Sequence, residues 1–563
     1  MSPVQLPQVG DRYTPQEAAH FRTMGWWQDA TPAAILDDWV ARQPGATYMT
    51  DGLRSVSYAE FRGQAYRLAA ALRGHGIGMG DTVLVQLPSW VEFAVTAMAV
   101  SRIGAIVVPV LPIYRADEIR YILQHSCAKA AVCAGSFRNF DHLTMFRALR
   151  AELPAVQTLV VVRGEPGAGE WAFDALARPE LGIAVPELSA LGAGPSADDG
   201  HVIVYTSGTE SRPKGCFHTF NTVDFSVRTM QRAHAWTTRD VAFGPSPLAH
   251  STGYITSYLL PLRAGASSHV MDVWAPEDGL RRIAQYGCTI TTTATTFLRM
   301  LVEAYRPGEH DASSMRIWIA AGSPIPAQVV QEARKVLPTC EVLSHYGRSE
   351  NQVSTTCPTG VDPTKVLSSD GCAPEGVQIA VLDDANRHLA PHQVGDIAYK
   401  GPGHMLGYFR DPEKTRAMFS ADGFSRSGDL GYLDDDGYVR VSGRAKDIII
   451  RGGMNISARE IEDHLLAHPA VADVAVVAMP DARLGERVCA YIVPAAGHKV
   501  GLDDVCKFLR DHRAIAMQKL PERVEVIDAL PTTPTGKVQK FLLRARIAEQ
   551  LKHEAARQAK EIS

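Results

Sequence analysis

The sequence lacks several features that would assign it to a simple functional class. Its nine cysteines form no Cys-x-x-Cys pair, and their odd number fits neither a disulfide framework nor a structural zinc site. The net charge of −4 gives no electrostatic reason to expect binding to nucleic acid. No apolar run approaches the roughly 20 residues that span a bilayer, although peripheral membrane contact stays open. The first residues show no basic region followed by an apolar stretch, so we expect no signal peptide and a cytoplasmic, reducing location.

A Walker phosphate loop is also absent, but another polar loop follows a buried strand. Residues 202–204 (VIV) are typical of that strand, and residues 205–215 (YTSGTESRPKG) add hydroxyls, glycines and one lysine. A Walker loop needs Ser or Thr directly after its Gly-Lys pair, whereas Gly215 follows Lys214 here. Hydroxyls and glycine N–H groups can surround phosphate oxygens, and Lys214 can neutralise their charge. The loop predicts a nucleotide triphosphate site outside the P-loop NTPase class, although alone it would more often be a polar surface loop.

Strand and helix patterns alternate through the first half of the chain, which predicts an α/β fold with a largely parallel sheet covered on both faces. We expect strands at 81–87, 104–110, 128–133, 156–162 and 201–205, and helices at 57–72, 90–101 and 117–125. Short β-like runs from about residue 370 predict a small β-rich subdomain. Beyond residue 447 we expect a compact α+β unit with helices at 458–466, 502–512 and 538–561 and strands at 474–479, 487–493 and 523–527.

Further segments could complete a nucleotide site, although each is weak alone. His250 lies in PLAHSTGY before an apolar helix, and Gly322 lies in AAGSP, where small residues let a flat ring approach the backbone. The segment YGRSE offers an aromatic face, a hydroxyl and a carboxylate, and Asp429 in SGD could bind a ribose diol. Arg444, Lys446 and, in PTGK, Lys537 follow.

Together and in this order, the segments resemble the adenylate-forming superfamily of acyl-CoA synthetases, luciferases and peptide-synthetase adenylation domains, the AMP-binding enzymes. The resemblance covers essentially the whole chain, from about Gly25 to Lys540. The segments LAHSTGY, KDIIIRGG and LGERVCAY are most similar to short/medium-chain acyl-CoA synthetases and cyclohexanecarboxylate-CoA ligases. The resemblance implies a large N-terminal domain of layered α/β/α subdomains (1–444, with the β-rich part at about 370–444). A hinge (445–447) and a small, mobile α+β C-terminal domain (448–563) would follow.

The resemblance also implies an acid–thiol ligase that uses ATP, Mg²⁺ and coenzyme A. A carboxylate would attack the α-phosphorus of ATP to form an acyl-adenylate, and the thiol of coenzyme A would then displace AMP. Since the first step brings an anion against a polyanion, positive charge in a dry site must cancel their repulsion. Lys537, His250 and Glu350 are the catalytic residues that the resemblance implies, with Lys537 between the α-phosphate and the carboxylate.

The other roles follow from the same resemblance. The implied nucleotide-binding residues are Thr206, Ser207, Gly208, Thr209, Lys214, Gly322, Tyr346, Ser349, Asp429 and Arg444. Glu350 and Thr209 would hold the magnesium ion. The implied walls of the acyl pocket are Tyr254, Thr296, Phe297, Ala321 and Arg348. Lys446 would be the hinge about which the small domain swings, and Gly452 and Gly453 would line the channel for the pantetheine arm.

Three positions depart from the family pattern and leave the acid open. Arg348 fills a slot usually taken by a small or apolar residue, Thr296 stands where proline is common, and Ser425-Arg426 replaces an aromatic or histidine pair. The acid is expected to be medium-chain, alicyclic or bulky polycyclic. Alternative functions are a variant that mainly makes the thioester from supplied acyl-AMP, an acyl-AMP ligase that loads a carrier protein, a luciferase-like oxygenase and a non-catalytic binding protein. The oligomeric state is open, with a homodimer as one option.

Overall fold

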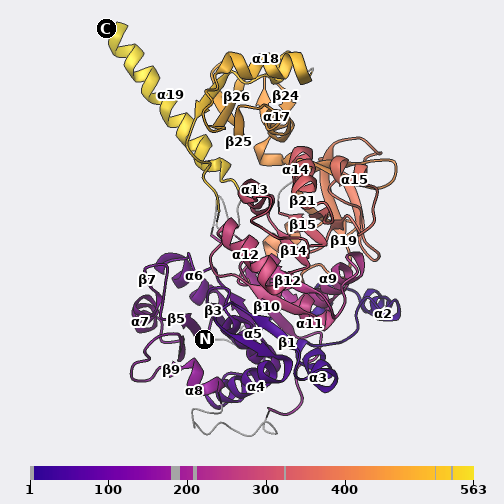
Figure 1. Cartoon of the computed structure of the whole chain (residues 1–563), viewed down its shortest axis with the longest axis vertical. Coiled ribbons are helices and arrows are strands. Elements are labelled where there is room, and N and C mark those ends of the chain that lie inside the picture. Colours follow the sequence, from indigo (N-terminus) through magenta and orange to yellow (C-terminus); the bar gives the residue numbers. More distant parts are fainter. Residues whose placement is uncertain are drawn as a thin grey trace.

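The computed structural model describes residues 5–178, 191–206, 212–322, 325–513, 515–533 and 537–562. They form a large N-terminal α/β domain and a small C-terminal α+β domain, which lies at the top of Figure 1. The predicted alternation is confirmed at most elements. The helix expected at 90–101 is α5 (Val91–Arg102), for example, and the strand expected at 156–162 is β8 (Thr158–Val162).

Two eight-stranded sheets form the large domain. The first sheet has a parallel centre, with an antiparallel strand at each edge. Its order is β17 (Thr355–Thr356), β16 (Glu341–Tyr346), β15 (Ile317–Ala321), β14 (Ile290–Thr293), β12 (Val241–Gly244), β13 (Ser267–Val270), β1 (Thr47–Thr50) and β2 (Ser55–Ser57). The order of the second is β20 (Gly407–Tyr408), β11 (Gly215–Thr219), β10 (Gly200–Tyr205), β4 (Ile106–Pro109), β3 (Thr82–Gln86), β5 (Ala130–Ala134), β8 and β9 (Trp171–Ala172).

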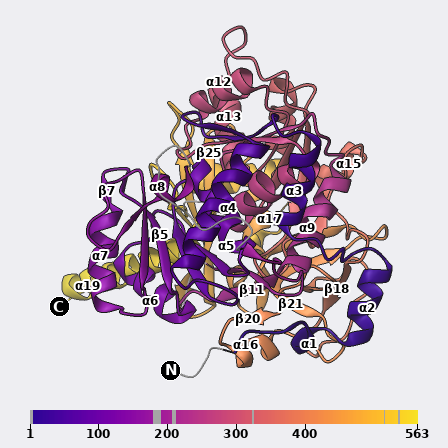
Figure 2. The same ribbon diagram turned by 90° about the horizontal axis from the view of Figure 1, so that it is seen from below.

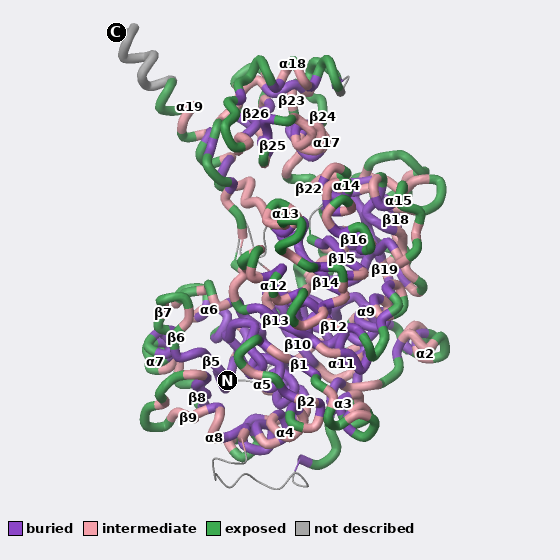
Figure 3. Tube along the Cα trace, in the orientation of Figure 1, coloured by how far each residue is buried: buried purple, intermediate pink, exposed green. Residues whose placement is uncertain are grey.

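The main apolar core lies between these sheets (Figure 3). Successive side chains of a strand point to opposite faces, so Val83 and Val85 of β3 join this core while Leu84 packs on the other face. The core helices are α3 (Pro32–Arg42), α4 (Tyr58–Gly74), α5, α9 (Phe220–Ala233), the π-helix η3 (Tyr254–Leu259) and α11 (Leu260–Ala264). Helix α5 is buried on every side from Val91 to Ser101, because sheets lie on both sides of its layer.

The outer helices complete the layers. Helices α6 (Ala116–Ser126) and α7 (His142–Glu152) cover the outer face of the second sheet. Helices α12 (Pro276–Tyr286), α13 (Thr295–Ala304) and α14 (Ala327–Val336) pack together beside the first sheet. Helices thus connect successive parallel strands such as β13 and β14 (through α12) and β15 and β16 (through α14), as the sequence pattern predicts.

The β-rich subdomain is a four-stranded antiparallel sheet of β18 (Gln378–Leu382), β19 (Gly395–Lys400), β21 (Ser425–Leu433) and β22 (Val439–Arg444). Helices α1 (Val9–Arg12) and α2 (Pro15–Thr23) lie beside it in Figure 2. The Tyr13 hydroxyl between these helices donates to the carbonyls of Gly401 and His404 at 3.0 and 2.8 Å. The N-terminal segment therefore ties this subdomain to the rest of the large domain.

The small domain packs helices α17 (Ala458–Leu465), α18 (Leu502–Arg513) and α19 (Lys540–Ile562) on a five-stranded sheet. Its strands are β23 (Ile449–Arg451), β24 (Met454–Ile456), β25 (Val471–Asp481), β26 (Gly485–Pro494) and β27 (Arg523–Val526). The hairpin of β23 and β24 was not expected from the sequence, since three-residue strands carry almost no periodic signal. In the described part of the chain, no helix combines the length and apolarity needed to cross a membrane.

Candidate functional site

A cavity of about 80 Å³ lies where parallel strands of the first sheet end. Residues that follow β12, β14, β15 and β16 line it, and Lys537 of the small domain reaches it as well. In open α/β sheets, the carboxyl ends of the strands are the usual place for ligands, because the connecting loops diverge there. The lining of this cavity is Met230, Ser246, Pro247, His250, Ser251, Thr252, Ile255, Thr256, Thr292, Ala294, Phe297, Ala321, Gly322, His345, Gly347, Arg348, Ser349, Gln352 and Lys537.

Lys537 and Gly322 bring the two domains into contact at this cavity. Gly322 has a φ of +78°, and a Cβ atom at this position would lie 3.0 Å from Cε of Lys537. Burial lowers the pKa of Lys537 to about 8, and the cations Arg444 and Arg348 act in the same direction. The ammonium group thus sits in a dry, positively charged place, where an anion would relieve the repulsion.

Arg348 and Glu350 form a charged pair between β16 and the β-rich subdomain. Arg348 Nε lies 3.4 Å from Glu350 Oε2, and its Nη1 lies 3.7 Å from Asp429 Oδ2. The Tyr408 hydroxyl donates to Glu350 Oε1 at 2.7 Å. Burial alone would raise the pKa of Glu350, but Arg348 and Tyr408 outweigh it and lower the pKa to about 2. Glu350 is therefore ionised at any physiological pH and could help to hold a hard cation.

Asp429 on β21 contacts polar side chains from two other strands, β16 and β22. The Tyr346 hydroxyl donates to Asp429 Oδ2 at 2.7 Å, and Arg444 Nε lies 3.5 Å from its Oδ1. Ser349 joins the cavity wall, and its carbonyl accepts from His218 Nε2 at 2.7 Å. A carboxylate has two acceptor oxygens, so Asp429 is suited to accept hydrogen bonds from the two hydroxyls of a ribose.

His250 begins the short helix α10 (Ser251–Gly253) and lines the cavity. Its Nδ1 accepts the backbone N–H of Thr252 at 3.3 Å, so the neutral ring carries its proton on Nε2. Burial lowers the pKa of His250 to about 3, and the charge of Lys537 adds to the effect. The ring is therefore a neutral hydrogen-bond donor rather than a base.

The polar loop is only partly described. Thr206 N–H donates to the Lys214 carbonyl at 2.9 Å, which closes the loop at its base. Ser207, Gly208 and Thr209, three of the predicted phosphate contacts, lie outside the described residues. Lys214 lies 4.9 Å from the centre of the Tyr408 ring and borders a second hollow with Arg212 and Lys414.

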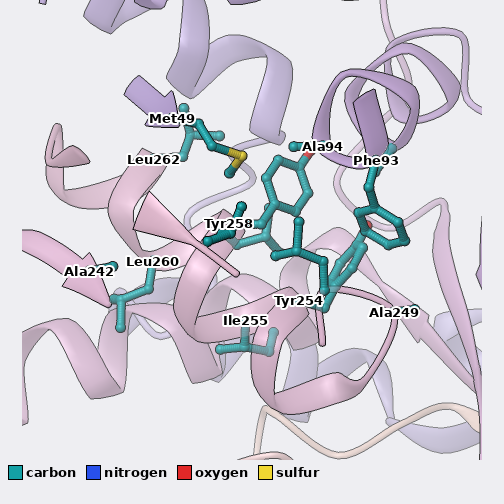
Figure 4. Close-up of a cluster of buried hydrophobic side chains, with 14 of the residues drawn as sticks. Met49, Phe93, Ala94, Ala242, Ala249, Tyr254, Ile255, Tyr258, Leu260 and Leu262 are labelled. Carbon is teal, nitrogen blue, oxygen red and sulfur yellow. The ribbon is translucent and has the colours of Figure 1, made fainter. Parts of the chain in front are cut away.

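Two predicted pocket residues, Tyr254 and Thr296, lie outside the lining of this cavity. Tyr254 is fully buried in the core between the sheets (Figure 4), where its hydroxyl pairs with His201 Nε2 at 3.1 Å. Ile255 and Thr256, the next residues of η3, face the cavity in its place. Thr296 is not part of the lining either; consecutive helix residues differ by about 100° around the axis, and Phe297 is the one that faces inward. Phe297, Ala321 and Arg348 do line the cavity.

The predicted hinge and channel residues lie outside the cavity lining. Lys446 belongs to the 3-10 turn η4 (Ala445–Asp447), and its carbonyl accepts from Arg544 Nη1 at 2.6 Å. Gly452 and Gly453 form the turn of the β23–β24 hairpin with φ values of +57° and +85°. Two successive positive φ values are the requirement of a two-residue hairpin turn, which explains both glycines locally. Their role in a channel stays a prediction.

Several lining residues were not expected from the sequence, among them Met230, Ser246, Thr292, His345 and Gln352. Thr292 and His345 lie near the carboxyl ends of β14 and β16, and this position at the ends of two parallel strands was the available signal. Gln352 is two residues beyond Glu350 in an irregular segment, and nothing in its local pattern separates it from an ordinary loop residue.

Comparisons with known proteins agree with this geometry. The family model for "AMP-binding enzyme" matches residues 36–409, and the model for "AMP-binding enzyme C-terminal domain" matches residues 460–537. The chain is 35% identical to the medium-chain fatty-acid–CoA ligase of Escherichia coli, over 96% of this chain and 94% of that protein. It is 31% identical to the 2,3-dihydroxybenzoate-AMP ligase of Bacillus subtilis, over 95% and 97% of the two chains.

A solved structure is similar over almost its whole length. ATP-bound MatB from Rhodopseudomonas palustris superposes with a TM-score of 0.81 at 29% identity, over 92% of this chain and 99% of that chain.

Proposed function

The chain belongs to the AMP-binding enzyme family, and we propose that it is a ligase that joins a carboxylic acid to coenzyme A through an acyl-adenylate. One observation carries the proposal: Lys537 of the small domain reaches the cavity that Gly322, His250 and Arg348 of the large domain also line. This arrangement places the cation of Lys537 and the neutral hydrogen-bond donor of His250 on the wall of one cavity.

In the first step, a carboxylate oxygen of the acid forms a bond to the α-phosphorus of ATP, and the bond to the bridging oxygen breaks to release pyrophosphate. In this proposal Lys537 contacts both the α-phosphate and the carboxylate, and Nε2–H of His250 donates to the carboxylate; both residues line the cavity. Asp429 and Arg444 hold the ribose, and Tyr346 and the backbone at Gly322 flank the adenine. Thr206, Ser207, Gly208, Thr209 and Lys214 face the phosphates in this proposal.

Magnesium would enter with the phosphates of ATP. Among the described residues, no three His, Cys, Asp or Glu side chains lie together as ligands, while Glu350 is an ionised carboxylate beside the cavity. One carboxylate with substrate phosphates and water is the usual environment of Mg²⁺ in nucleotide sites, so Glu350 fits this ion, and Thr209, outside the described residues, stays a predicted ligand. It would supply charge neutralisation to the departing pyrophosphate.

In the second step, the thiol sulfur forms a bond to the acyl carbon, the bond to AMP breaks, and the thiol proton passes to water. We propose that the small domain rotates about Lys446 before this step, so that Gly452 and Gly453 approach the pantetheine arm. All nine cysteines are free, which suits a reducing compartment, and we propose the cytoplasm.

The thiol acceptor is the point on which relatives differ, since one is named a CoA ligase and another an AMP ligase. We propose free coenzyme A, because the segments KDIIIRGG and LGERVCAY are most similar to CoA ligases.

The test incubates the enzyme with ATP, Mg²⁺ and a panel of acids. Exchange of labelled pyrophosphate into ATP reports the first step, and mass detection of acyl-CoA reports the second. Acid-dependent exchange with acyl-CoA formation is expected. Exchange without acyl-CoA would favour a carrier protein as acceptor, and acyl-CoA formed only from synthetic acyl-AMP would favour the thioester-only variant. Absence of both reactions would contradict the proposal.

A further inference from the structure

Three buried polar side chains of the cavity each have at least one polar atom without a hydrogen-bond partner among the described residues. They are Thr292, His345 and Gln352, which are 4%, 8% and 7% exposed. The atoms without a partner among the described residues are Thr292 Oγ1, His345 Nδ1 and both the Nε2 and Oε1 atoms of the Gln352 amide. Buried polar atoms are nearly always paired, because leaving them bare costs the full loss of hydration.

Other polar residues of the same wall are satisfied. Ser246 Oγ donates to the Thr292 carbonyl at 3.0 Å, and Thr256 Oγ1 donates to the Thr252 carbonyl at 2.8 Å. The wall is therefore not uniformly short of partners. The unpartnered atoms belong to residues at the ends of β14 and β16 and to the segment just after β16.

The hydrogen bond at Nε2 of His345 determines whether its unpartnered Nδ1 atom is a donor or an acceptor. Nε2 of His345 lies 3.0 Å from the Gln352 carbonyl, which can only accept, so Nε2 carries the proton. Burial lowers the pKa of His345 to about 4, which keeps the ring neutral at physiological pH. Nδ1 is therefore an acceptor that needs an O–H or N–H donor. The Gln352 amide adds one donor and one acceptor, and the Thr292 hydroxyl can serve as either.

From this juxtaposition we infer that the acid carries a hydroxyl or N–H group, which Thr292, His345 and Gln352 bind inside the acyl pocket. The inference rests on the proposed function, because it identifies the substrate class of the same site.

The first experiment compares acids that differ only by one hydroxyl group. Suitable pairs are benzoate and 3-hydroxybenzoate, cyclohexanecarboxylate and 3-hydroxycyclohexanecarboxylate, and hexanoate and 6-hydroxyhexanoate. In at least one pair, the hydroxylated acid is expected to have a kcat/KM for pyrophosphate release higher by roughly 10²-fold. Sites built for a substrate hydroxyl reject the analogue that lacks it, since their own polar groups are then left unpaired.

The second experiment removes the polar atoms while keeping their shape. Gln352→Leu and Thr292→Val are expected to reduce the preference for the hydroxylated acid at least tenfold, and to leave the melting temperature unchanged or higher. Removal of an unpartnered buried polar group does not destabilise the folded state, so a structural role would give the opposite stability result.

Tyr258→Phe is the matched control. Its hydroxyl is buried and has no partner among the described residues, but Tyr258 belongs to the core of Figure 4 and not to the cavity lining. This variant is expected to keep the preference of the unchanged enzyme.

Calorimetric binding of the same acid pairs separates the two proposals. Tighter binding of hydroxylated acids without any adenylation would support the pocket and contradict the proposed function. Equal use of both members of every pair, with no effect of Gln352→Leu, would overturn the inference and assign the three side chains to bound water. Absence of both binding and adenylation would overturn both.

Discussion

The core between the two sheets and the contact between the two domains are formed by different kinds of side chain. The core is a continuous apolar cluster around α5 and includes fully buried Trp318. The domain contact relies on polar links. Arg299 of α13 lies 2.6 Å from Asp473 of β25, and Ser457 Oγ donates to the Ser442 carbonyl at 2.6 Å.

This difference shows how one chain can combine a rigid site with a movable lysine. Apolar burial is lost completely when a surface separates, whereas a partly exposed ion pair such as Arg299–Asp473 regains hydration when its partners separate. The cavity wall of the large domain should therefore stay in place while Lys537 moves in and out of the cavity with the small domain. Variants in the core and at the domain contact test this difference.

The largest effect is expected in the core. Trp318→Ala removes a buried indole whose Nε1 donates to Thr293 Oγ1 at 2.9 Å, and should lower the free energy of unfolding by about 3–5 kcal/mol. Chemical denaturation followed by fluorescence measures this loss. Trp318→Phe should lose clearly less, and a loss below about 1 kcal/mol in the alanine variant would contradict the assignment of this core.

Lys537→Ala should lower pyrophosphate exchange by roughly 10²–10³-fold, because a preorganised charge is lost where the transition state needs it. Acyl-CoA formation from synthetic acyl-AMP should change little, because in our proposal the small domain rotates before the thioester step and Lys537 does not act in it. Lys552→Ala removes an exposed lysine of α19 and is the control. An equal loss in both half-reactions would show that Lys537 does not act in adenylation alone.

Gly322→Ala tests the closeness of the two domains at the cavity. A positive φ strains any residue with a Cβ by roughly 1–2 kcal/mol, and the added atom would also press on Lys537 Cε at 3.0 Å. We expect pyrophosphate exchange to fall about 5–30-fold, with the thioester step spared. Unchanged exchange would mean that the lysine does not need this approach.

The pH dependence of adenylation should reveal the lowered pKa of Lys537. Because kcat/KM reports the free enzyme, its value for pyrophosphate release should fall about tenfold per pH unit above pH 8 as the ammonium loses its proton. Lys537→Arg should remove this decline, since an arginine stays charged. The effect on stability has the opposite sign: the folded pKa of about 8 lies below the usual 10.5, so the destabilisation present below pH 8 disappears as the pH rises towards 10.5. A flat profile for both enzymes would contradict the assigned environment.

The smallest effect is expected at the polar link between the domains. Asp473→Ala removes an ion pair whose side chains are 22% and 23% exposed and which is worth about 1 kcal/mol, so the ratio of the two half-reaction rates should shift less than about fivefold towards the thioester step. The exchanged pair Arg299→Asp with Asp473→Arg should restore the ratio. A change as large as that of Lys537→Ala would show that this pair controls the domain arrangement.

Local pattern was a good guide to elements and a poor one to side-chain direction. The helix at 117–125 and the strand at 201–205 were predicted to within a residue or two, because their apolar periodicity continues over a whole element. Tyr254 was predicted in the acyl pocket because it directly follows a motif that borders the cavity, but the direction of the side chains in the π-helix puts Ile255 and Thr256 in the cavity lining.

The amino-acid order alone determined the alternation of strands and helices, the polar loop after residues 202–204 and the family to which these segments point. The tertiary structure decided which distant residues meet. Arg348 lies 3.7 Å from Asp429, and Thr292 shares a wall with His345 and Gln352, although these partners come from separate segments of the chain. Periodicity reports which face of an element is apolar, whereas the partners of a polar atom depend on where separate strands end in the folded sheet.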